Sequence, residues 1–320
     1  MLNFIYLGIG LLLLIKCADL MVAGSVSLAR KLGVSTLIIG LTVISFGTSL
    51  PELLVSFNAG MDGNADFAIS NVVGSNIANV LLVLGVAAIV RPLPVKDSTV
   101  VSEIPFSLTA ALLMGFLANA AIFSNVPELS ISQLDGAMLL FFFVLFLIYI
   151  FRTAGDNEVL HEELKKVSLS RTREFVYIGL GIAGLYVGGQ LVVDSSVNVA
   201  EYLGVNDVVI GLTIVAIGTS APELVASSVA AYRGYTDVAV GNVVGSNIFN
   251  ILWVIGFTAS FKELPFEIVT NTDLVLVVAA SALVLVAMAI SRTNSILRWH
   301  GILFVTLYAG YLGFTVHRAF

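Results

Sequence analysis

The sequence predicts an all-α polytopic membrane protein with ten transmembrane helices, built as two inverted five-helix repeats with broken helices at the centre. Three observations lead to this fold class. The 320-residue chain is 58% hydrophobic and 11% charged, with a mean hydropathy of +1.02. Apolar runs of about 20 residues, the length that crosses roughly 30 Å of hydrocarbon as a helix, recur along the whole chain. Finally, the two halves of the chain repeat each other at an offset of 171 residues.

The apolar runs define ten expected spans joined by short loops. They lack the period-2 alternation of a membrane β-barrel and are too long for barrel strands. Their approximate limits are 3–29, 36–60, 66–90, 99–121, 130–151, 174–200, 207–231, 237–260, 270–291 and 296–317. We therefore divide the chain into a first five-helix repeat (1–152), a linker (153–173) and a second five-helix repeat (174–320).

The basic residues predict how these spans are oriented, because lysine and arginine concentrate in cytoplasmic loops. Only Lys262 and Arg318 fall in loops of one set, and Lys16 lies within the first span. The other twelve basic residues fall in the alternate loops: Arg30, Lys31, Arg91, Lys96, Arg152, Lys165, Lys166, Arg171, Arg173, Arg233, Arg292 and Arg298. Both termini are therefore expected outside and the 153–173 linker in the cytoplasm. The net charge of −6, without a basic tail, gives no support to nucleic acid binding.

The repeat is strongest in two blocks, residues 40–85 and 211–256. IGLTVISFGTSLPELLVS aligns with IGLTIVAIGTSAPELVAS, and DFAISNVVGSNIANVLLVLG aligns with DVAVGNVVGSNIFNILWVIG, with no gap between the blocks. Each repeat holds five spans, an odd number, so the second repeat must enter the membrane upside down relative to the first. Such inverted repeats are typical of secondary transporters.

Two carboxylates lie where the chain is otherwise most apolar. Glu52 and Glu223 fall near the middle of their spans, and intramembrane carboxylates cost several kcal/mol and are usually functional. Each follows a proline, Pro51 or Pro222, which lacks the N–H that a continuous helix needs. We expect a helix break at each motif, with free backbone carbonyls that only a binding site could tolerate in a membrane.

The polar side chains around these glutamates predict a site for a hard cation. Hydroxyl residues share a helix face with each glutamate at i, i+1 and i+4, and a second polar series follows in the next span at four-residue steps. Every candidate ligand is an oxygen, which favours Ca²⁺ or Na⁺ over zinc, copper or iron. Two facing carboxylates need a cation or proton between them. The irregular oxygen set suits Ca²⁺ better than Mg²⁺.

The motifs GTSLPE with GTSAPE, and GSNIANVLLVLG with GSNIFNILWVIG, resemble the two α-repeats of the calcium/cation antiporter superfamily. The similarity is strongest to the sodium/calcium exchangers and their prokaryotic relatives. It implies a secondary antiporter rather than an enzyme, in a prokaryotic plasma membrane, with Ca²⁺ and Na⁺ or H⁺ as substrates and no cofactor. The implied ligands are Thr48, Ser49, Glu52, Ser75, Asn79, Thr219, Ser220, Glu223, Ser246 and Asn250, with the backbone carbonyls of Ser45 and Ala216.

One departure from the family leaves the coupling ion open. Many sodium-coupled members resemble this chain but carry aspartate where Asn250 stands, so coupling to Na⁺, H⁺ or K⁺ must be distinguished. A cation channel with a paired-glutamate filter is the alternative of another class, although filters are usually built from several subunits. We interpret the remaining repeat asparagines as interhelical hydrogen-bonding groups. Lys16 and Asp19, one turn apart, are expected to form an ion pair.

Overall fold

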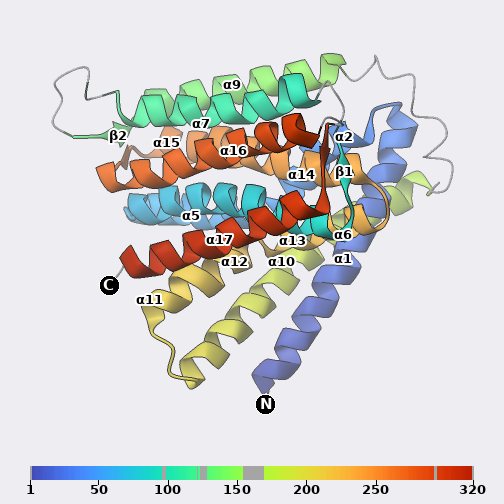
Figure 1. Cartoon of the computed structure of the whole chain (residues 1–320), viewed down its shortest axis with the longest axis horizontal. Helices are drawn as coiled ribbons and strands as arrows, with labels where there is room; N and C mark the ends of the chain where they lie inside the picture. The colour runs from blue at the N-terminus through green and yellow to red at the C-terminus, as the bar shows by residue number, and fades with distance from the viewer. Residues whose placement is uncertain are drawn as a thin grey trace.

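The computed structural model describes residues 2–95, 99–120, 122, 128–153, 169–291 and 294–318. The described chain is nearly all helical (Figure 1). The first repeat contains α1 (Leu2–Leu32), α2 (Thr36–Ile39), η1 (Gly40–Ile44), α3 (Ser45–Thr48), α4 (Leu50–Asp62), α5 (Ala65–Ala78), η2 (Asn79–Val83), α6 (Leu84–Val90), η3 (Thr99–Glu103), α7 (Ile104–Ala118) and α9 (Gln133–Thr153). The second contains α10 (Arg171–Tyr202), α11 (Asp207–Ile210), η6 (Gly211–Val215), α12 (Ala216–Thr219), α13 (Ala221–Tyr232), α14 (Thr236–Ile248), η7 (Phe249–Ile255), α15 (Gly256–Phe261), η8 (Ile268–Thr270), α16 (Asn271–Ser291) and α17 (Arg298–Arg318).

Seven of the described helical stretches are long and apolar enough to cross a membrane, and two bent helix pairs raise the number to nine. The protein is therefore an integral membrane protein. The expected fourth span corresponds to a shorter apolar helix, Glu103–Ala118. Ten spans, and the inversion of one repeat relative to the other, remain predictions.

The two bent pairs occur at the glycine–proline motifs. Thr36–Thr48 meets Leu50–Asp62 at 47°, and Thr213–Thr219 meets Ala221–Tyr232 at 53°. The residue at each bend, Ser49 or Ser220, leaves the helical region with ψ near zero, and proline follows within the first turn of the next helix. The helix breaks expected from Pro51 and Pro222 are thus present.

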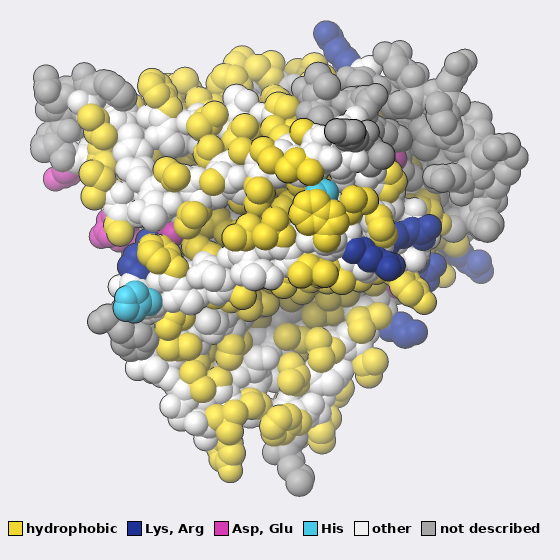
Figure 2. Space-filling view, viewed as in Figure 1, with side chains coloured by type: hydrophobic (Ala, Val, Ile, Leu, Met, Phe, Trp, Pro, Cys, Tyr) yellow, Lys and Arg dark blue, Asp and Glu magenta, His cyan; other side chains and the backbone are white. Residues whose placement is uncertain are grey.

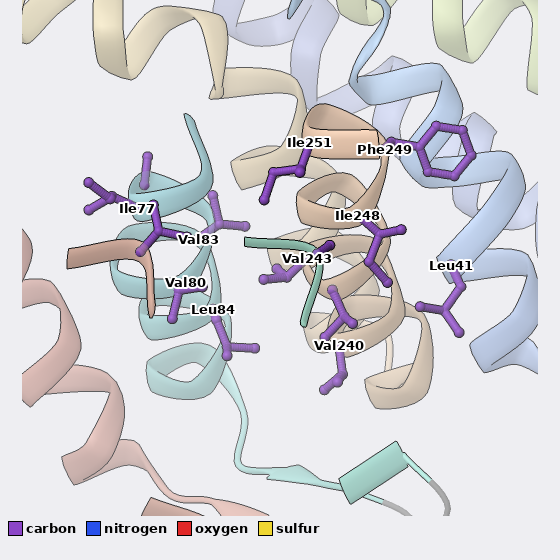
Figure 3. Close-up of a cluster of buried hydrophobic side chains, with 14 of the residues drawn as sticks. Leu41, Ile77, Val80, Val83, Leu84, Val240, Val243, Ile248, Phe249 and Ile251 are labelled. Carbon is purple, nitrogen blue, oxygen red and sulfur yellow. The ribbon is translucent and has the colours of Figure 1, made fainter. Parts of the chain in front are cut away.

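The most deeply buried helical stretches are Ala65–Val90 and Thr236–Phe261, and they form the centre of the molecule. Their apolar side chains include Ile77 and Val80 on one stretch and Val243 and Ile251 on the other (Figure 3). Each stretch contains a π-helical segment, η2 or η7, at matching positions of the repeat, and η1 and η6 match in the same way. The sequence pattern did not predict these π-helical segments. Such segments often occur at functional sites.

The long helices α1 and α10 pack beside each other at the edge of this centre (Figure 1). Their contact is close because glycines face it: a β-carbon on Gly188 would lie 3.1 Å from the Gly10 carbonyl oxygen. The ion-pair partner expected for Asp19 of α1 is wrong. Asp19 forms an ion pair with Arg233, at the end of α13, instead of with Lys16. The cation that pairs with Asp19 therefore comes from the end of a neighbouring helix that packs against α1.

Two short antiparallel β pairings join loops that the charge pattern assigns to the same side. β1 (Leu93–Pro94) pairs with β4 (Ser295–Ile296), both in loops expected in the cytoplasm. β2 (Ser130–Ile131) pairs with β3 (Leu264–Pro265), both expected outside. Hydrophobic side chains are spread over the visible face, while most of the visible lysine and arginine side chains gather near one end (Figure 2). Most of the 153–173 linker lies outside the described residues.

The orientation can be tested by thiol labelling in intact cells. We expect a cysteine in the 153–173 linker to react only with membrane-permeant reagents, and a cysteine at Asp62, exposed at the end of α4, to react with impermeant ones. The background protein carries Cys17→Ala, which removes the buried native thiol. The opposite labelling pattern would invert the topology and every access route inferred from it.

Candidate cation-binding site

Glu52 and Glu223 lie in the first turns of α4 and α13, directly after the two bends. Both side chains are fully buried. A helix N-terminus carries a partial positive charge and free N–H groups, so each break favours a carboxylate at this position. The local sequence therefore places one acidic group at each of the two broken helices in the interior.

The second polar series lies on the central helices next to these glutamates. Ser75 is on α5 and Asn79 opens η2, while Ser246 is on α14 and Asn250 lies within η7. All four side chains are buried. Glu52 and Ser75 lie close together, as do Glu223 and Ser246. The two glutamates and these four side chains thus lie on helices that contact one another.

The first repeat's broken helix contacts the second repeat directly. Thr48 Oγ1 donates to the Asn242 Oδ1 oxygen at 3.2 Å and lies 3.4 Å from Ser246 Oγ. Ser49 Oγ donates to Glu223 Oε1 at 3.2 Å. Residues separated by more than 170 positions therefore form one polar cluster, as the repeat predicted.

Many oxygens of this cluster have no hydrogen-bond partner among the described residues. A buried polar atom without a partner costs about 1–3 kcal/mol, so such atoms are rare unless a ligand satisfies them. Seven of the unpartnered atoms are oxygens of predicted ligand residues: both carboxylate oxygens of Glu52, Glu223 Oε2, Ser75 Oγ, Ser220 Oγ, Asn79 Oδ1 and Asn250 Oδ1. The donor set consists of oxygens, two of them in carboxylates, which is the set that a hard cation prefers.

The backbone carbonyls at Ser45 and Ala216 are less free than expected. The Ser45 carbonyl accepts from the Ser49 amide at 2.9 Å and lies 3.3 Å from Thr48 Oγ1, whose one proton is shared between this carbonyl and Asn242 Oδ1. The Ala216 carbonyl accepts from Thr219 Oγ1 at 3.2 Å. A cation at either carbonyl would therefore compete with the neighbouring threonine hydroxyl for its lone pair.

A cavity of about 220 Å³ reaches the site at Thr219. Its lining includes Thr219, Gln190 and the two prolines of the breaks, Pro51 and Pro222. Thr219 is half-buried, whereas its repeat counterpart Thr48 is fully buried. The two equivalent threonines therefore differ in their surroundings, because only Thr219 lines this cavity.

Two asparagines that the sequence assigned to helix packing also contact site residues. Asn242 accepts the Thr48 hydroxyl, and Asn76 Oδ1 accepts from Asn250 Nδ2 at 3.1 Å. Asn76 also fulfils the packing role, because Asn76 and Asn247 donate reciprocally to each other's backbone carbonyls at 3.2 and 3.4 Å. The available signal was the four-residue step from Asn242 to Ser246, which places both on one helix face.

Two buried carboxylates at paired helix breaks, surrounded by unpartnered oxygens inside an apolar helical protein, define a membrane cation transporter. The sequence profile of the sodium/calcium exchanger protein family matches residues 2–152 and again 173–317. The chain belongs to that family, and it is an antiporter of the cation/Ca²⁺ class.

Relatives and solved structures agree over nearly the whole chain. The chain is 37% identical to the putative antiporter CaxA of Alkalimonas amylolytica, with 96% of each protein covered. It is 31% identical to the sodium/calcium exchanger MaX1 of Methanosarcina acetivorans, with 97% of each covered. A solved structure of the sodium-calcium exchanger NCX_Mj matches with a TM-score of 0.81 and 33% identity over 98% of both chains.

Proposed function

We propose that this protein exchanges Ca²⁺ for Na⁺ or H⁺ by alternating access at one central site. The site consists of Glu52 and Glu223 with the hydroxyl, amide and carbonyl oxygens predicted from the repeat. The observation that carries the proposal is the cluster of buried oxygens without partners around the two carboxylates. The relatives named as sodium/calcium exchangers support Ca²⁺ and Na⁺ as substrates.

Charge balance supports Ca²⁺ as one of the two substrates. The empty site carries at most two negative charges, because the described residues contain no cluster of three or more His, Cys, Asp and Glu side chains. One Ca²⁺ or two monovalent cations neutralise it, and a third monovalent ion enters without compensation. Burial disfavours charged carboxylates, so protons compete with the cation and acid pH inhibits transport.

The one-sided cavity supports alternating access. A carrier exposes its site to one side of the membrane at a time. Here Thr219 lines a cavity, whereas the equivalent Thr48 is fully buried. On the orientation predicted from the basic residues, the cavity faces outside. A channel would instead need a continuous path past the two carboxylates, and the packed Thr48 side argues against one.

The coupling ion is tested by Ca²⁺ uptake into proteoliposomes loaded with Na⁺, with K⁺ or at a different internal pH. We expect uptake only when the coupling cation is present inside, because the empty carrier must return with cargo. Na⁺-, H⁺- and K⁺-dependent exchange are separated by which gradient supports uptake. Uptake that needs no internal cation would identify a channel and refute the proposal.

A further inference from the structure

A groove of about 520 Å³ lies between α16 and α17. Both helices pack on the central stretch Ala65–Val90, and α5 runs between them (Figure 1). Among the described residues, α16 and α17 contact each other little, so the space between them stays open. The apolar lining, from the floor to the two walls, includes Ile77, Leu81, Leu276, Leu283, Leu307 and Phe314. None of the predicted cation ligands lines this groove, so it is separate from the cation site.

The groove has the length and the polarity of one membrane leaflet. On α16 its lining extends from Thr272 to Leu283, which corresponds to about 17 Å of helix. Half of the hydrocarbon core of a bilayer is about 15 Å thick. The side chains of Leu307 and Phe314 are 43% and 47% exposed, so the groove opens at the surface that faces the membrane. An acyl chain of one leaflet therefore fits it in length and in chemistry.

An ion pair lies at one end of the groove. Arg318 Nη2 donates to Asp273 Oδ2 at 3.0 Å and thereby joins the end of α17 to the start of α16. The guanidinium also lies over the ring of Phe314, a lining residue, at 5.8 Å from the ring centroid. The Arg318 side chain is 33% exposed and that of Asp273 only 12%, so the cation is the accessible member of the pair.

Arg318 has the chemistry and the position to bind a lipid phosphate. A guanidinium carries five N–H donors in a planar fork that suits phosphate, and Asp273 Oδ2 takes one of them. On the orientation predicted from the basic residues, this end of the groove lies at the outer surface, where a phospholipid of the outer leaflet has its phosphate. The chains of such a lipid extend from the phosphate toward the middle of the bilayer, which is the direction of the groove from Phe314 to Leu307.

We propose that the groove between α16 and α17 binds one glycerophospholipid of the outer leaflet. One acyl chain lies along Ile77 and Leu81, and Arg318, held in place by Asp273, binds the phosphate. Ile77 and Leu81 are two residues before and after Asn79, so the chain packs on the face of the helix opposite this predicted ligand. The lipid thus fills a space that the helices leave open, without entering the cation site.

The steric test fills the groove with a side chain. Gly310 of α17 lines the groove, and Gly313, one turn further along, does not; a β-carbon on either meets no atom within 4 Å. Binding of radioactive phosphatidylglycerol to the delipidated protein in detergent should be at least about tenfold weaker in Gly310→Leu and unchanged in the matched control Gly313→Leu. Phosphatidylglycerol should also raise the thermal unfolding temperature of Gly313→Leu but not of Gly310→Leu, because a ligand stabilises only the folded protein that binds it. Equal binding by the two variants would overturn the inference.

A second test addresses the phosphate. The double variant Arg318→Gln/Asp273→Asn removes the ion pair as a unit, so that no unpaired charge is left behind. It should bind phosphatidylglycerol at least about tenfold more weakly but bind palmitate, which has a chain and no phosphate, as the unchanged protein does. Asp273→Asn keeps the arginine and should lose less affinity, and Lys262→Gln, which removes the other basic residue of the predicted outer loops, should lose none. Full phosphatidylglycerol affinity in the double variant, or palmitate binding as tight as phosphatidylglycerol binding in the unchanged protein, would contradict phosphate recognition by Arg318.

Discussion

Glu52→Gln and Glu223→Gln are each expected to abolish Ca²⁺ transport while the protein still folds. Glutamine keeps the shape and one oxygen but removes half of the charge at a site where both side chains are fully buried. In a low-dielectric interior, one lost carboxylate costs a divalent cation several kcal/mol, or more than a hundredfold in affinity. The measurement is Ca²⁺ uptake into proteoliposomes at equal protein content.

Glu103→Gln provides the matched control. Glu103 is also a buried glutamate, but it lies at the start of the Glu103–Ala118 helix and accepts from Tyr149 at 3.5 Å, away from the cluster. It should retain transport, because its loss leaves the central charge unchanged. Robust uptake by Glu52→Gln or Glu223→Gln would contradict the assignment of the carboxylates.

Asn250→Asp is expected to strengthen monovalent cation binding by at least about tenfold and to move more positive charge per Ca²⁺. A third carboxylate lets the site hold one more monovalent cation with its charge balanced. The Asn250 amide now donates to Asn76 Oδ1, so the new carboxylate requires the Asn76 amide to turn and give up its bond to the Asn247 carbonyl. Thermal stability should therefore fall slightly as monovalent binding rises. The Na⁺ dependence and the net charge per Ca²⁺ are measured in liposomes.

Asn79→Asp separates charge from position in this experiment. Asn79 is the repeat counterpart of Asn250, and neither of its polar atoms has a partner among the described residues, so the new charge breaks no hydrogen bond. Equal shifts in both variants would mean that total charge sets the coupling. If Asn250→Asp left the Na⁺ dependence and charge movement unchanged, position 250 would have no role in coupling.

The fold class and the ligand candidates could be predicted because they depend on local features of the sequence. Apolar runs long enough to span a bilayer, and a proline before each glutamate, give helices and breaks whatever their tertiary surroundings. The offset of 171 residues then pairs Glu52 with Glu223 and the rest of the set, and the structure brings Thr48 to Asn242 and Ser246, and Ser49 to Glu223.

The differences between the two halves could not be predicted from the same information. Nearly identical sequences at Thr48 and Thr219 predict identical environments, yet one is buried and the other lines a cavity. Which of the two threonines is buried depends on how whole segments pack. Two packings of the same segments can differ in free energy by only a few kcal/mol. The prediction of the ion-pair partner of Asp19 was wrong for a related reason. Arg233 is 214 positions away in the sequence and reaches Asp19 only through tertiary packing.

Equilibrium binding of radioactive Ca²⁺ to the purified protein tests most directly whether one carboxylate site serves both substrates. The account predicts one Ca²⁺ per chain, displaced competitively by the coupling cation, with no binding left in Glu52→Gln or Glu223→Gln. Ca²⁺ that stays bound in the Glu52→Gln/Glu223→Gln double variant, or that the coupling cation cannot displace, would contradict a single shared central site.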